Sequence, residues 1–487
     1  YIVEYIVEHT LGPVFEERAE TFRELMEQLE PKYEAFGELD AKIRAGDKGE
    51  RSHNKRKELH LEIEVLENRA SEALLSIRVC DPAMGSGHFL KEATDKLAEK
   101  IITLLAEFPE NPVSRLLEKI RSQILESLRE QHIDIDAEEH LKDTNLVKRM
   151  VMKRCIYGVD LNPMAVELAK LSLWLDSFTV GAPLSFLDHH LKCGNSLIGS
   201  TVGEIREKLE TGQSHMFGGP FRGLLQATEL MREVALKTDA TFSEVEQSIE
   251  RSEAFEEAVR PYKQVLDIWL SRHFGNERAD EFLIAYSDQV THLLQGDEVS
   301  LPEKQQGMID KAEELRREKY FFHWELEFPE VFVDLKKTDW LENPGFDVVV
   351  GNPPYGMTEN DYEKGFLRRK YETSEGREEK YKLFTEAAYN AVKKQGFFSY
   401  ISSASMLSNR FDAKLRELLL QECHLKELIT FSYSVFDDPT VHSVIFIAKK
   451  TKVKEYKVQI KARIEQSDQI DDEGRFEPKD RFLKDQY

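Results

Sequence analysis

The order of apolar and polar positions along the chain predicts an α/β protein in which strands alternate with helices. Short apolar runs rich in β-branched residues predict strands at 75–80, 156–160 and 346–350. Helical spacing of apolar residues predicts a helix at 91–106 and another that ends near Phe178, with Met164, Leu168, Leu171 and Leu175 on one of its faces. Strands that alternate with helices in this way are typical of a mainly parallel sheet.

The last third of the chain predicts further strands at 397–402, 428–431 and 441–448. The segments on either side of Phe436 look like a hairpin, as an antiparallel strand inserted beside its predecessor would give. The polar stretch 361–379 is expected to form a loop, and a helix is expected to open at Lys382.

Long helical segments interrupt this alternation. Residues 1–20 predict a helix punctuated by Gly12 and Pro13, and 21–76 predicts two antiparallel helices that break near 45–49. Between 201 and 320 the sequence is mostly helical and contains no motif that indicates chemistry. Residues 451–487 turn polar.

The segment Gly351-Asn352-Pro353-Pro354-Tyr355 follows a buried strand and carries the clearest candidate chemistry. Two successive prolines fix the turn and remove two backbone donors, which leaves its carbonyl groups free to accept hydrogen bonds. Asn352 and the Pro353 carbonyl suit the two N–H groups of an exocyclic amine, and Tyr355 suits stacking on a flat ring. Ligands bind at the carboxyl ends of strands in open α/β sheets.

Three other strand ends carry polar or glycine residues. Asp81 opens a Gly85-x-Gly87 turn between a strand and a helix, where backbone can approach a ligand closely. Asp160 ends the next strand, where an acid typically accepts hydrogen bonds from ribose hydroxyls, although it could also only cap the following helix. Asn195 follows a third strand end and could address an adenine amino group.

The composition of the 487 residues is ordinary for a globular protein, with 41% hydrophobic and 32% charged residues. The net charge of −23 gives no sign of the basic face that a nucleic-acid-binding protein normally has. A small basic cleft within an acidic protein would still be consistent with this charge, and a salt-adapted host would also produce it. No apolar run approaches the roughly 18 residues of a membrane span. The four scattered cysteines fit a reducing cytoplasm, and His189, His190 and Cys193 lack the second clustered pair of a zinc site, so we predict no metal.

With these motifs in this order, the chain resembles the gamma-class DNA adenine-N6 methyltransferases. More narrowly, it is similar to the large Type IIG restriction–modification enzymes and their phage-defence relatives. The resemblance covers 1–20, 77–200 and 321–450, and the aromatic segment 323–332 is its narrowest signature. It implies a Rossmann-like class I S-adenosylmethionine-dependent methyltransferase fold, which is α/β with a mixed seven-stranded sheet, an antiparallel last strand and large helical insertions.

The resemblance also implies the cofactor S-adenosyl-L-methionine, the partner double-stranded DNA and a set of site residues. The implied catalytic residues are Asn352, Pro353, Pro354 and Tyr355, with Tyr355 and Phe436 stacking on the target base. The implied cofactor-binding residues are Asp81, Pro82, Ala83, Gly85, Gly87, Phe89, Asp160, Leu161, Asn195, Ser196, Leu197 and Phe384. On this basis we divide the chain into a core helix (1–20), a helical hairpin insertion (21–76), a cofactor-binding half (77–200), a helical insertion (201–320), a catalytic half (321–450) and a linker or the start of a target-recognition region (451–487).

The sequence departs from the family pattern in three respects. The family's Tyr-Thr-Pro is absent before Tyr1, Asn195 stands where an aspartate is commoner, and no nuclease signature is visible. The first residue is not Met, so we expect the natural beginning of the protein to lie upstream. The resemblance implies that a nuclease domain would precede this chain and that a target-recognition region would follow its last predicted strand.

The expected reaction is direct methyl transfer to N6 of an adenine flipped out of duplex DNA. Two alternatives remain open at this point. The first is a methyltransferase that acts on an RNA base or a glutamine side chain, which the long insertion and the aromatic signature disfavour. The second is a cofactor-bound DNA specificity scaffold without turnover, which the intact Asn352–Tyr355 motif disfavours.

Overall fold

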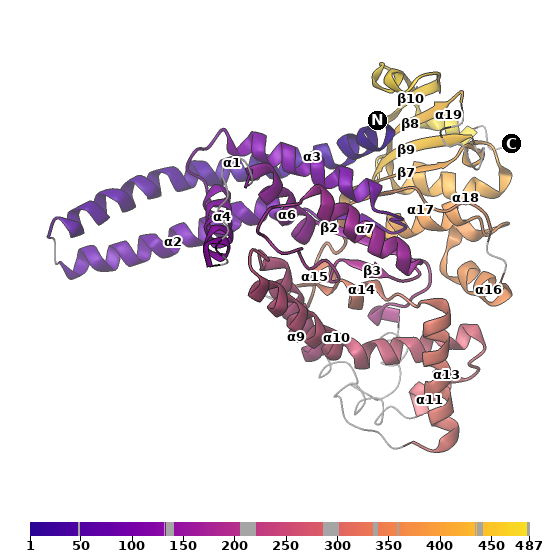
Figure 1. The fold of residues 1–487 in the computed structure, drawn as a ribbon. Helices are drawn as coiled ribbons and strands as arrows, with labels where there is room; N and C mark the ends of the chain where they lie inside the picture. The colour runs from indigo at the N-terminus through magenta and orange to yellow at the C-terminus, as the bar shows by residue number, and fades with distance from the viewer. Residues whose placement is uncertain are drawn as a thin grey trace.

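One nine-stranded sheet forms the centre of the fold, with the strand order β11-β10-β8-β9-β7-β6-β1-β2-β3 (Figure 1). The computed structural model describes residues 1–46, 49–130, 132, 141–204, 221–285, 301–334, 339–357, 360–433, 435 and 442–484. The strands of the sheet are β1 (Val79–Asp81), β2 (Ile156–Asp160), β3 (Leu191–Cys193), β6 (Phe346–Gly351), β7 (Val392–Ser403), β8 (His424–Phe431), β9 (Ser443–Lys449), β10 (Lys457–Ile464) and β11 (Arg475–Pro478). A separate two-stranded ribbon pairs β4 (Val333–Asp334) with β5 (Asp339–Trp340).

The pairing of the strands confirms the class I methyltransferase fold. From β3 through β2, β1, β6 and β7 the neighbouring strands are parallel, and β9 lies antiparallel between β7 and β8. The expected seven strands are thus present with the expected antiparallel member. Two further strands, β10 and β11, come from the 451–487 segment, where a linker or the start of a target-recognition region was expected, and extend the sheet beyond β8.

Helices cover both faces of the sheet (Figure 1). They are α1 (Ile2–Arg44), α2 (Glu50–Leu75), α3 (His88–Leu105), α4 (Pro112–Glu130), α6 (Asp143–Cys155), α7 (Pro163–Asp176), α9 (Phe221–Leu236), α10 (Phe242–Ser271), α11 (Ala279–Ala285), α13 (Glu303–Lys319), α14 (Trp324–Glu327), α15 (Pro329–Phe332), α16 (Asp361–Lys370), α17 (Lys380–Ala391), α18 (Ala413–Glu417) and α19 (Lys479–Lys484). None of the helices in the described ranges is long and apolar enough to cross a bilayer.

Successive side chains along each strand point to opposite faces of the sheet and pack into two separate hydrophobic cores. On β9, Ile445 and Ile447 pack with α1, α3, α4 and α6, whereas Val444 and Phe446 pack with α17 and the 321–332 segment. The period of two in a strand explains why neighbouring residues enter opposite layers. Both layers are needed because a parallel sheet is apolar on both faces.

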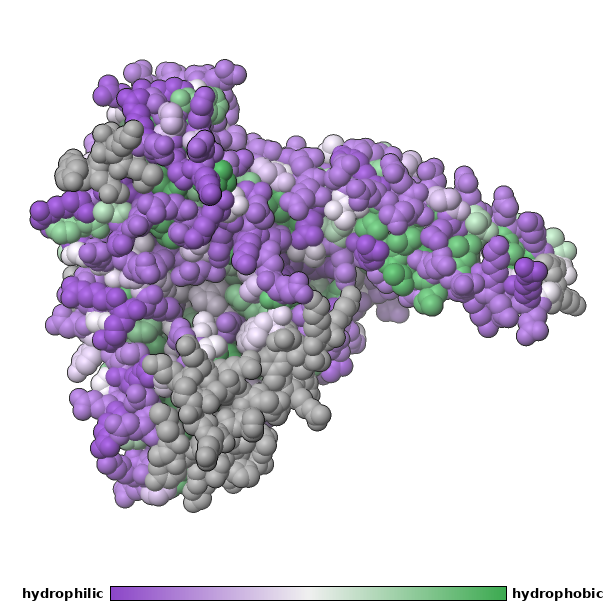
Figure 2. All heavy atoms as spheres, turned by 180° about the vertical axis from the view of Figure 1, so that it is seen from behind, coloured by the Kyte–Doolittle hydropathy of each residue, from purple (hydrophilic) through white to green (hydrophobic). Residues whose placement is uncertain are grey.

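Helix α1 is continuous from Ile2 to Arg44 and pairs with α2 to form an arm that projects from the body (Figure 1). The expectation that Gly12 and Pro13 punctuate the first helix is therefore wrong, because the helix runs straight through both residues. Its buried face, which includes Phe15 and Phe22, stabilises the helix more than an internal proline destabilises it. Figure 2 shows apolar patches among the hydrophilic side chains of this arm.

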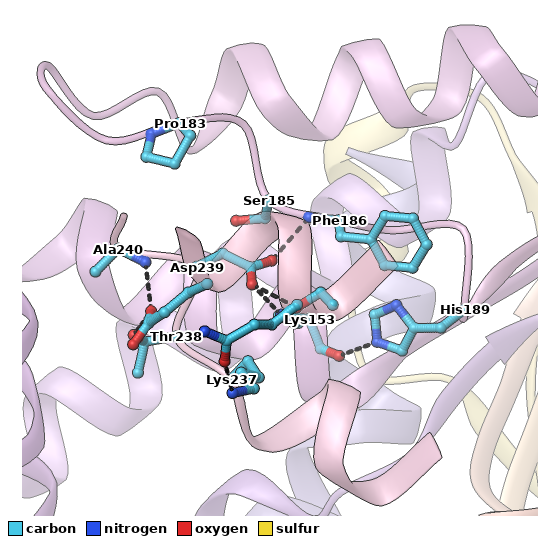
Figure 3. Close-up of polar contacts among 12 residues, drawn as sticks. Lys153, Pro183, Ser185, Phe186, His189, Lys237, Thr238, Asp239 and Ala240 are labelled. Atoms are coloured by element: carbon cyan, nitrogen blue, oxygen red, sulfur yellow. Dashed lines mark hydrogen bonds and ion pairs between the residues drawn. The ribbon is translucent and has the colours of Figure 1, made fainter. Parts of the chain in front are cut away.

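A buried ion pair joins the inserted helices to α6 (Figure 3). Lys153 at the end of α6 lies 2.5 Å from a carboxylate oxygen of Asp239, and both side chains are buried. The other oxygen of Asp239 accepts a hydrogen bond from the Phe186 N–H at 2.8 Å, and the Arg149 guanidinium donates to the Asp239 carbonyl. Burial lowers the pKa of Lys153 to about 8, against the opposing effect of Asp239.

The segment that follows the Asn352–Tyr355 turn is partly helical, so the expectation of a loop over 361–379 is wrong. Asn360 caps α16 by accepting hydrogen bonds from the N–H groups of Tyr362 and Glu363. Phe366 and Leu367 on this helix are buried, and this packing outweighs the polar composition that predicted a loop.

Candidate active site

Asp81 and Gly351 lie beside each other at the point where the strand order of the sheet reverses. Strand β1 pairs with β2 on one side and with β6 on the other, so the carboxyl ends of β1 and β6 are neighbours. A β-carbon built at Gly351 would lie only 2.5 Å from Oδ1 of Asp81. The absence of a side chain at Gly351 therefore lets the Asp81 carboxylate reach the start of the Asn352–Tyr355 turn.

The glycine turn after β1 has the backbone conformation that only glycine adopts easily. Gly85 and Gly87 have φ angles of 53° and 82°. A β-carbon at Gly85 would meet no atom within 4 Å, whereas one at Gly87 would press on Ala169 of α7 at 3.0 Å. The absence of a side chain at Gly87 thus allows the turn to pack closely against α7. Gly85 faces open space, where a ligand can approach the backbone.

Asp160 at the end of β2 is tied to the glycine turn. One of its oxygens accepts the Gly85 N–H at 2.9 Å, and the other accepts the Asn162 N–H at 2.8 Å. Asn162 in turn caps α7 by accepting the N–H of Met164 at 3.0 Å. Each carboxylate oxygen has a second lone pair, so Asp160 retains acceptor capacity toward ribose hydroxyls.

The segment after β3 is held in place by the aromatic segment near residue 322. The Phe322 N–H donates to the Ile198 carbonyl at 2.8 Å, and the Trp324 indole donates to the Ser196 carbonyl at 3.1 Å. A β-carbon at Gly194 would lie 2.2 Å from the Phe322 ring. The aromatic signature therefore supports the backbone that presents Asn195.

The Asn352–Tyr355 turn orients its amide through an internal hydrogen bond. The Tyr355 hydroxyl donates to Oδ1 of Asn352 at 3.3 Å and also lies 3.5 Å from the Ile401 carbonyl of β7. Asn352 and Tyr355 are partly exposed, whereas Pro353 is buried. A partly exposed amide oxygen beside a ring is the geometry that the sequence predicts for holding a planar amine.

Burial changes the acid–base character of the site. It raises the pKa of Asp81 to about 8, and the nearby Asp160 adds to this rise, while the Ala83 N–H hydrogen bond opposes it. Burial also raises the pKa of Tyr355, while a hydrogen bond with Ser443 opposes the rise. An acid with such a pKa changes its charge near neutral pH, and a cationic ligand would favour its ionised form.

Residues 154–436 match the Eco57I restriction-modification methylase family. The chain belongs to this family. RM.MjaORFECS2P of Methanocaldococcus jannaschii, assigned as a type II restriction enzyme and methyltransferase, is 25% identical over 93% of the chain. The Escherichia coli type II restriction enzyme and methyltransferase RM.Eco57I is 34% identical over 23% of the chain. The chain spans 35% of the length of the former and 12% of the latter.

Two solved structures match most of the chain at low TM-scores. The M protein of the type I restriction enzyme EcoKI has a TM-score of 0.34 and 12% identity, and the match covers 82% of this chain and 50% of that protein. The DrdV–DNA complex has a TM-score of 0.37 and 10% identity, with 86% of this chain and 29% of that protein covered.

The Eco57I-family chain brings several predicted site residues to one edge of the sheet. Asp81, Gly85, Asp160 and Asn352 come from the carboxyl ends of β1, β2 and β6 or the turns that follow them. The predicted cofactor residues Phe89, Leu197 and Phe384 are buried, whereas Leu161 is exposed. Phe436 lies outside the described residues, so its stacking role stays a prediction.

Two features near the predicted site of this family member do not follow from the sequence. Ser443 at the start of β9 contacts Tyr355, and nothing in its sequence context predicts this long-range pairing. Arg377 and Arg410 are exposed and flank the same Phe411 ring at 5.1 and 4.7 Å. Arg377 precedes α17 and Arg410 follows β7, so tertiary structure alone creates this basic pair.

Proposed function

We propose that this Eco57I-family chain transfers a methyl group to the N6 amine of adenine in duplex DNA. The observation that carries the proposal is the Asn352–Tyr355 turn beside Asp81 at the reversal point of the sheet. An amide oxygen, a proline carbonyl and an aromatic ring are grouped there next to a carboxylate.

Asn352 and Pro353 would accept hydrogen bonds from the two N–H groups of the target amine. These contacts withdraw the nitrogen lone pair from conjugation with the ring and make the amine a better nucleophile. Because Tyr355 donates to Oδ1 of Asn352, the amide is oriented before the base arrives. No covalent attachment to the protein is required, since positioning and hydrogen bonding act on the amine directly.

The residues around the glycine turn fit S-adenosyl-L-methionine. The open face of Gly85 admits a ligand, Asp160 can accept from ribose hydroxyls, and Asp81 can receive a cationic amino group. Asn195 lies after β3, where an adenine amino group would be recognised. When bound, this cofactor supplies an electrophilic methyl sulfonium.

Double-stranded DNA as the substrate is supported by the restriction-modification family and by the basic pair Arg377 and Arg410. A local basic rim can contact phosphate although the net charge is −23. The target adenine would have to leave the base stack to reach Asn352, and stacking on Tyr355 would offset part of the unstacking cost of a few kcal/mol. We expect the enzyme to act in the cytoplasm, within a longer restriction–modification or phage-defence protein of the Type IIG kind.

The decisive experiment compares Asn352→Ala with Asn343→Ala. Asn343 also forms hydrogen bonds through its side-chain amide, but with the Lys394 backbone at the protein surface. Transfer of a tritiated methyl group to duplex DNA should fall at least about 100-fold in Asn352→Ala, as on loss of a positioned polar group at a reacting centre. Calorimetry should show cofactor affinity within about twofold of the parental protein.

Asn343→Ala should retain parental transfer. The proposal is wrong if Asn352→Ala methylates DNA at the parental rate. RNA and glutamine-containing peptide serve as parallel substrates, and transfer to either of them in preference to DNA would replace the proposed substrate.

A further inference from the structure

Helix α7 carries a row of large apolar side chains that the protein does not bury. Met164, Leu168, Leu171 and Leu175 are 66%, 50%, 46% and 68% exposed, and Phe178 just beyond the helix is 56% exposed. The opposite face of α7, with Val166, Ala169 and Leu173, packs on the sheet and on α3 (Figure 1). The sequence placed these four residues on one face of an amphipathic helix, and the fold turns that face outward.

The spacing of this row is that of a coiled-coil seam. The four residues follow one another at intervals of four, three and four, which is the a/d pattern of a heptad repeat. Single exposed apolar residues are common on protein surfaces, but a contiguous stripe on one helix marks an interaction surface. A heptad seam is complementary to another helix with the same spacing.

We propose that the α7 seam pairs with α7 of a second copy of this chain in an antiparallel arrangement. A twofold axis that crosses α7 between Ala169 and Lys170 would place Leu168 opposite Leu171 of the partner subunit. The same axis would place Met164 opposite the partner subunit's Leu175. The seam is therefore self-complementary, as an isologous dimer requires.

The residues that border the seam permit this pairing. Ala165 and Ser172 on one border are small, which lets the two helices approach closely. Glu167 and Trp174 form the other border, and the antiparallel arrangement sets Glu167 against Trp174 of the partner subunit. Because Glu167 is the one charged residue among these four, no like charges meet. The antiparallel direction also opposes the two helix dipoles favourably.

The buried area predicts a weak, reversible dimer. An exposed side chain of this size carries on the order of 100 Å² of apolar surface. Five such side chains on each of two copies bring together on the order of 1,000 Å², which is near the lower limit for specific interfaces. Self-association should therefore depend on protein concentration in the micromolar range.

Sedimentation velocity of the purified chain tests the proposal. The weight-average sedimentation coefficient should rise between about 1 and 100 μM, with an amplitude that reports the dimer. Leu168→Glu with Leu171→Glu should remain monomeric over this range, as should Leu168→Lys with Leu171→Lys. An equimolar mixture of these two double variants should sediment as a 1:1 dimer at low salt, because opposite charges then meet across the seam.

The matched control is Leu61→Glu with Val65→Glu on α2, where two apolar residues are also exposed. This control should dimerise like the parental chain, and circular dichroism verifies the fold of every variant. A parental chain that stays monomeric at 100 μM would overturn the proposal and leave the seam to another partner. Unchanged dimerisation of the acidic α7 variant would also overturn it. Neither result bears on methyl transfer, so the proposed function is judged separately.

Discussion

Gly351 touches Asp81 so closely that a single added methyl group at residue 351 would lie 2.5 Å from the Asp81 carboxylate. The two residues end neighbouring strands, and they connect the turn that would hold the target amine with the loop that would hold the cofactor. The two halves of the proposed reaction site are thus close neighbours.

Gly351→Ala should separate these two halves. Because Asp81 is buried, either its carboxylate or the Asn352–Tyr355 turn must move, and such overpacking costs about 1–3 kcal/mol of folding stability. We expect methyl transfer to fall at least about tenfold and cofactor affinity to fall with it. Tritium transfer and calorimetry measure the two effects.

Gly307→Ala is the control for Gly351→Ala. Gly307 lies inside α13, and a β-carbon added there would meet no atom within 4 Å. Alanine should stabilise the helix there by up to about 1 kcal/mol and leave transfer unchanged. Parental activity in Gly351→Ala would show that the Asp81–Gly351 contact does not matter for the reaction.

Cofactor affinity should rise with pH between about 6 and 8. The folded-state pKa of Asp81 is raised from 3.8 to about 8, so in this range the free protein holds a proton that the unfolded chain has released. A cationic cofactor favours the ionised carboxylate and displaces this proton, so its affinity should increase by up to about tenfold per pH unit. Isothermal titration across this range measures the slope, which should be smaller in Asp81→Asn.

The proton that Asp81 holds in the folded state also predicts how the free energy of unfolding changes with pH. Because the native state binds more protons than the unfolded state from about pH 4 to about pH 8, the contribution of Asp81 to the free energy of unfolding falls as pH rises through this window. Asp81→Asn should remove that contribution. If cofactor affinity has the same pH slope in Asp81→Asn, Asp81 is not the titrating group.

Tyr355→Phe should distinguish the effect of the hydroxyl, which orients the Asn352 amide, from the effect of the ring, which is proposed to stack on the target base. The ring remains, but the hydroxyl that donates to Oδ1 of Asn352 is lost. We expect kcat to fall about tenfold with little change in the KM for DNA, because a hydrogen bond of this kind is worth roughly 0.5–1.5 kcal/mol. Tyr355→Ala should also raise the KM. Equal loss in both variants would mean that the ring has no separate role, and parental kcat in Tyr355→Phe would mean that the hydroxyl has none.

Lys153→Met should strongly destabilise the fold. The substitution leaves Asp239 buried without its ion-pair partner, and breaking such a pair costs about 3–5 kcal/mol. Arg23→Met removes an exposed partner of Glu107 and should cost less than about 1 kcal/mol. Urea unfolding of both variants gives the comparison. Equal midpoints would show that the Lys153–Asp239 pair does not anchor the insertion.

Arg377→Ala with Arg410→Ala should weaken DNA binding and leave cofactor binding intact. If both guanidinium groups contact phosphate, the slope of log K against log salt should become shallower by about 2. Arg475→Ala removes an exposed arginine of β11 outside the basic pair and should leave the slope unchanged. Fluorescence anisotropy with a labelled duplex at several salt concentrations measures the slope for each variant. An unchanged slope in the double variant would place the DNA elsewhere.

Local sequence was informative wherever one short segment contains the whole feature. The β2 strand and the Asn162 cap of α7 follow from patterns within a few residues, and the structure has both. Sequence patterns failed where packing overrides them. Pro13 lies within α1, and the polar 361–379 segment contains α16, because buried contacts with other elements stabilise both helices.

The sequence by itself determined the alternation of strands and helices, the glycine turn at Gly85 and the Asn352–Tyr355 turn, because each depends on backbone preferences within a short stretch. Only the tertiary structure decided that Gly351 meets Asp81, that Arg377 and Arg410 lie against the same Phe411 ring and that the α7 seam faces outward. These relationships join residues that are far apart in the chain or depend on which face the sheet covers. A local pattern encodes the type of an element, whereas its neighbours are set by the packing of the whole sheet.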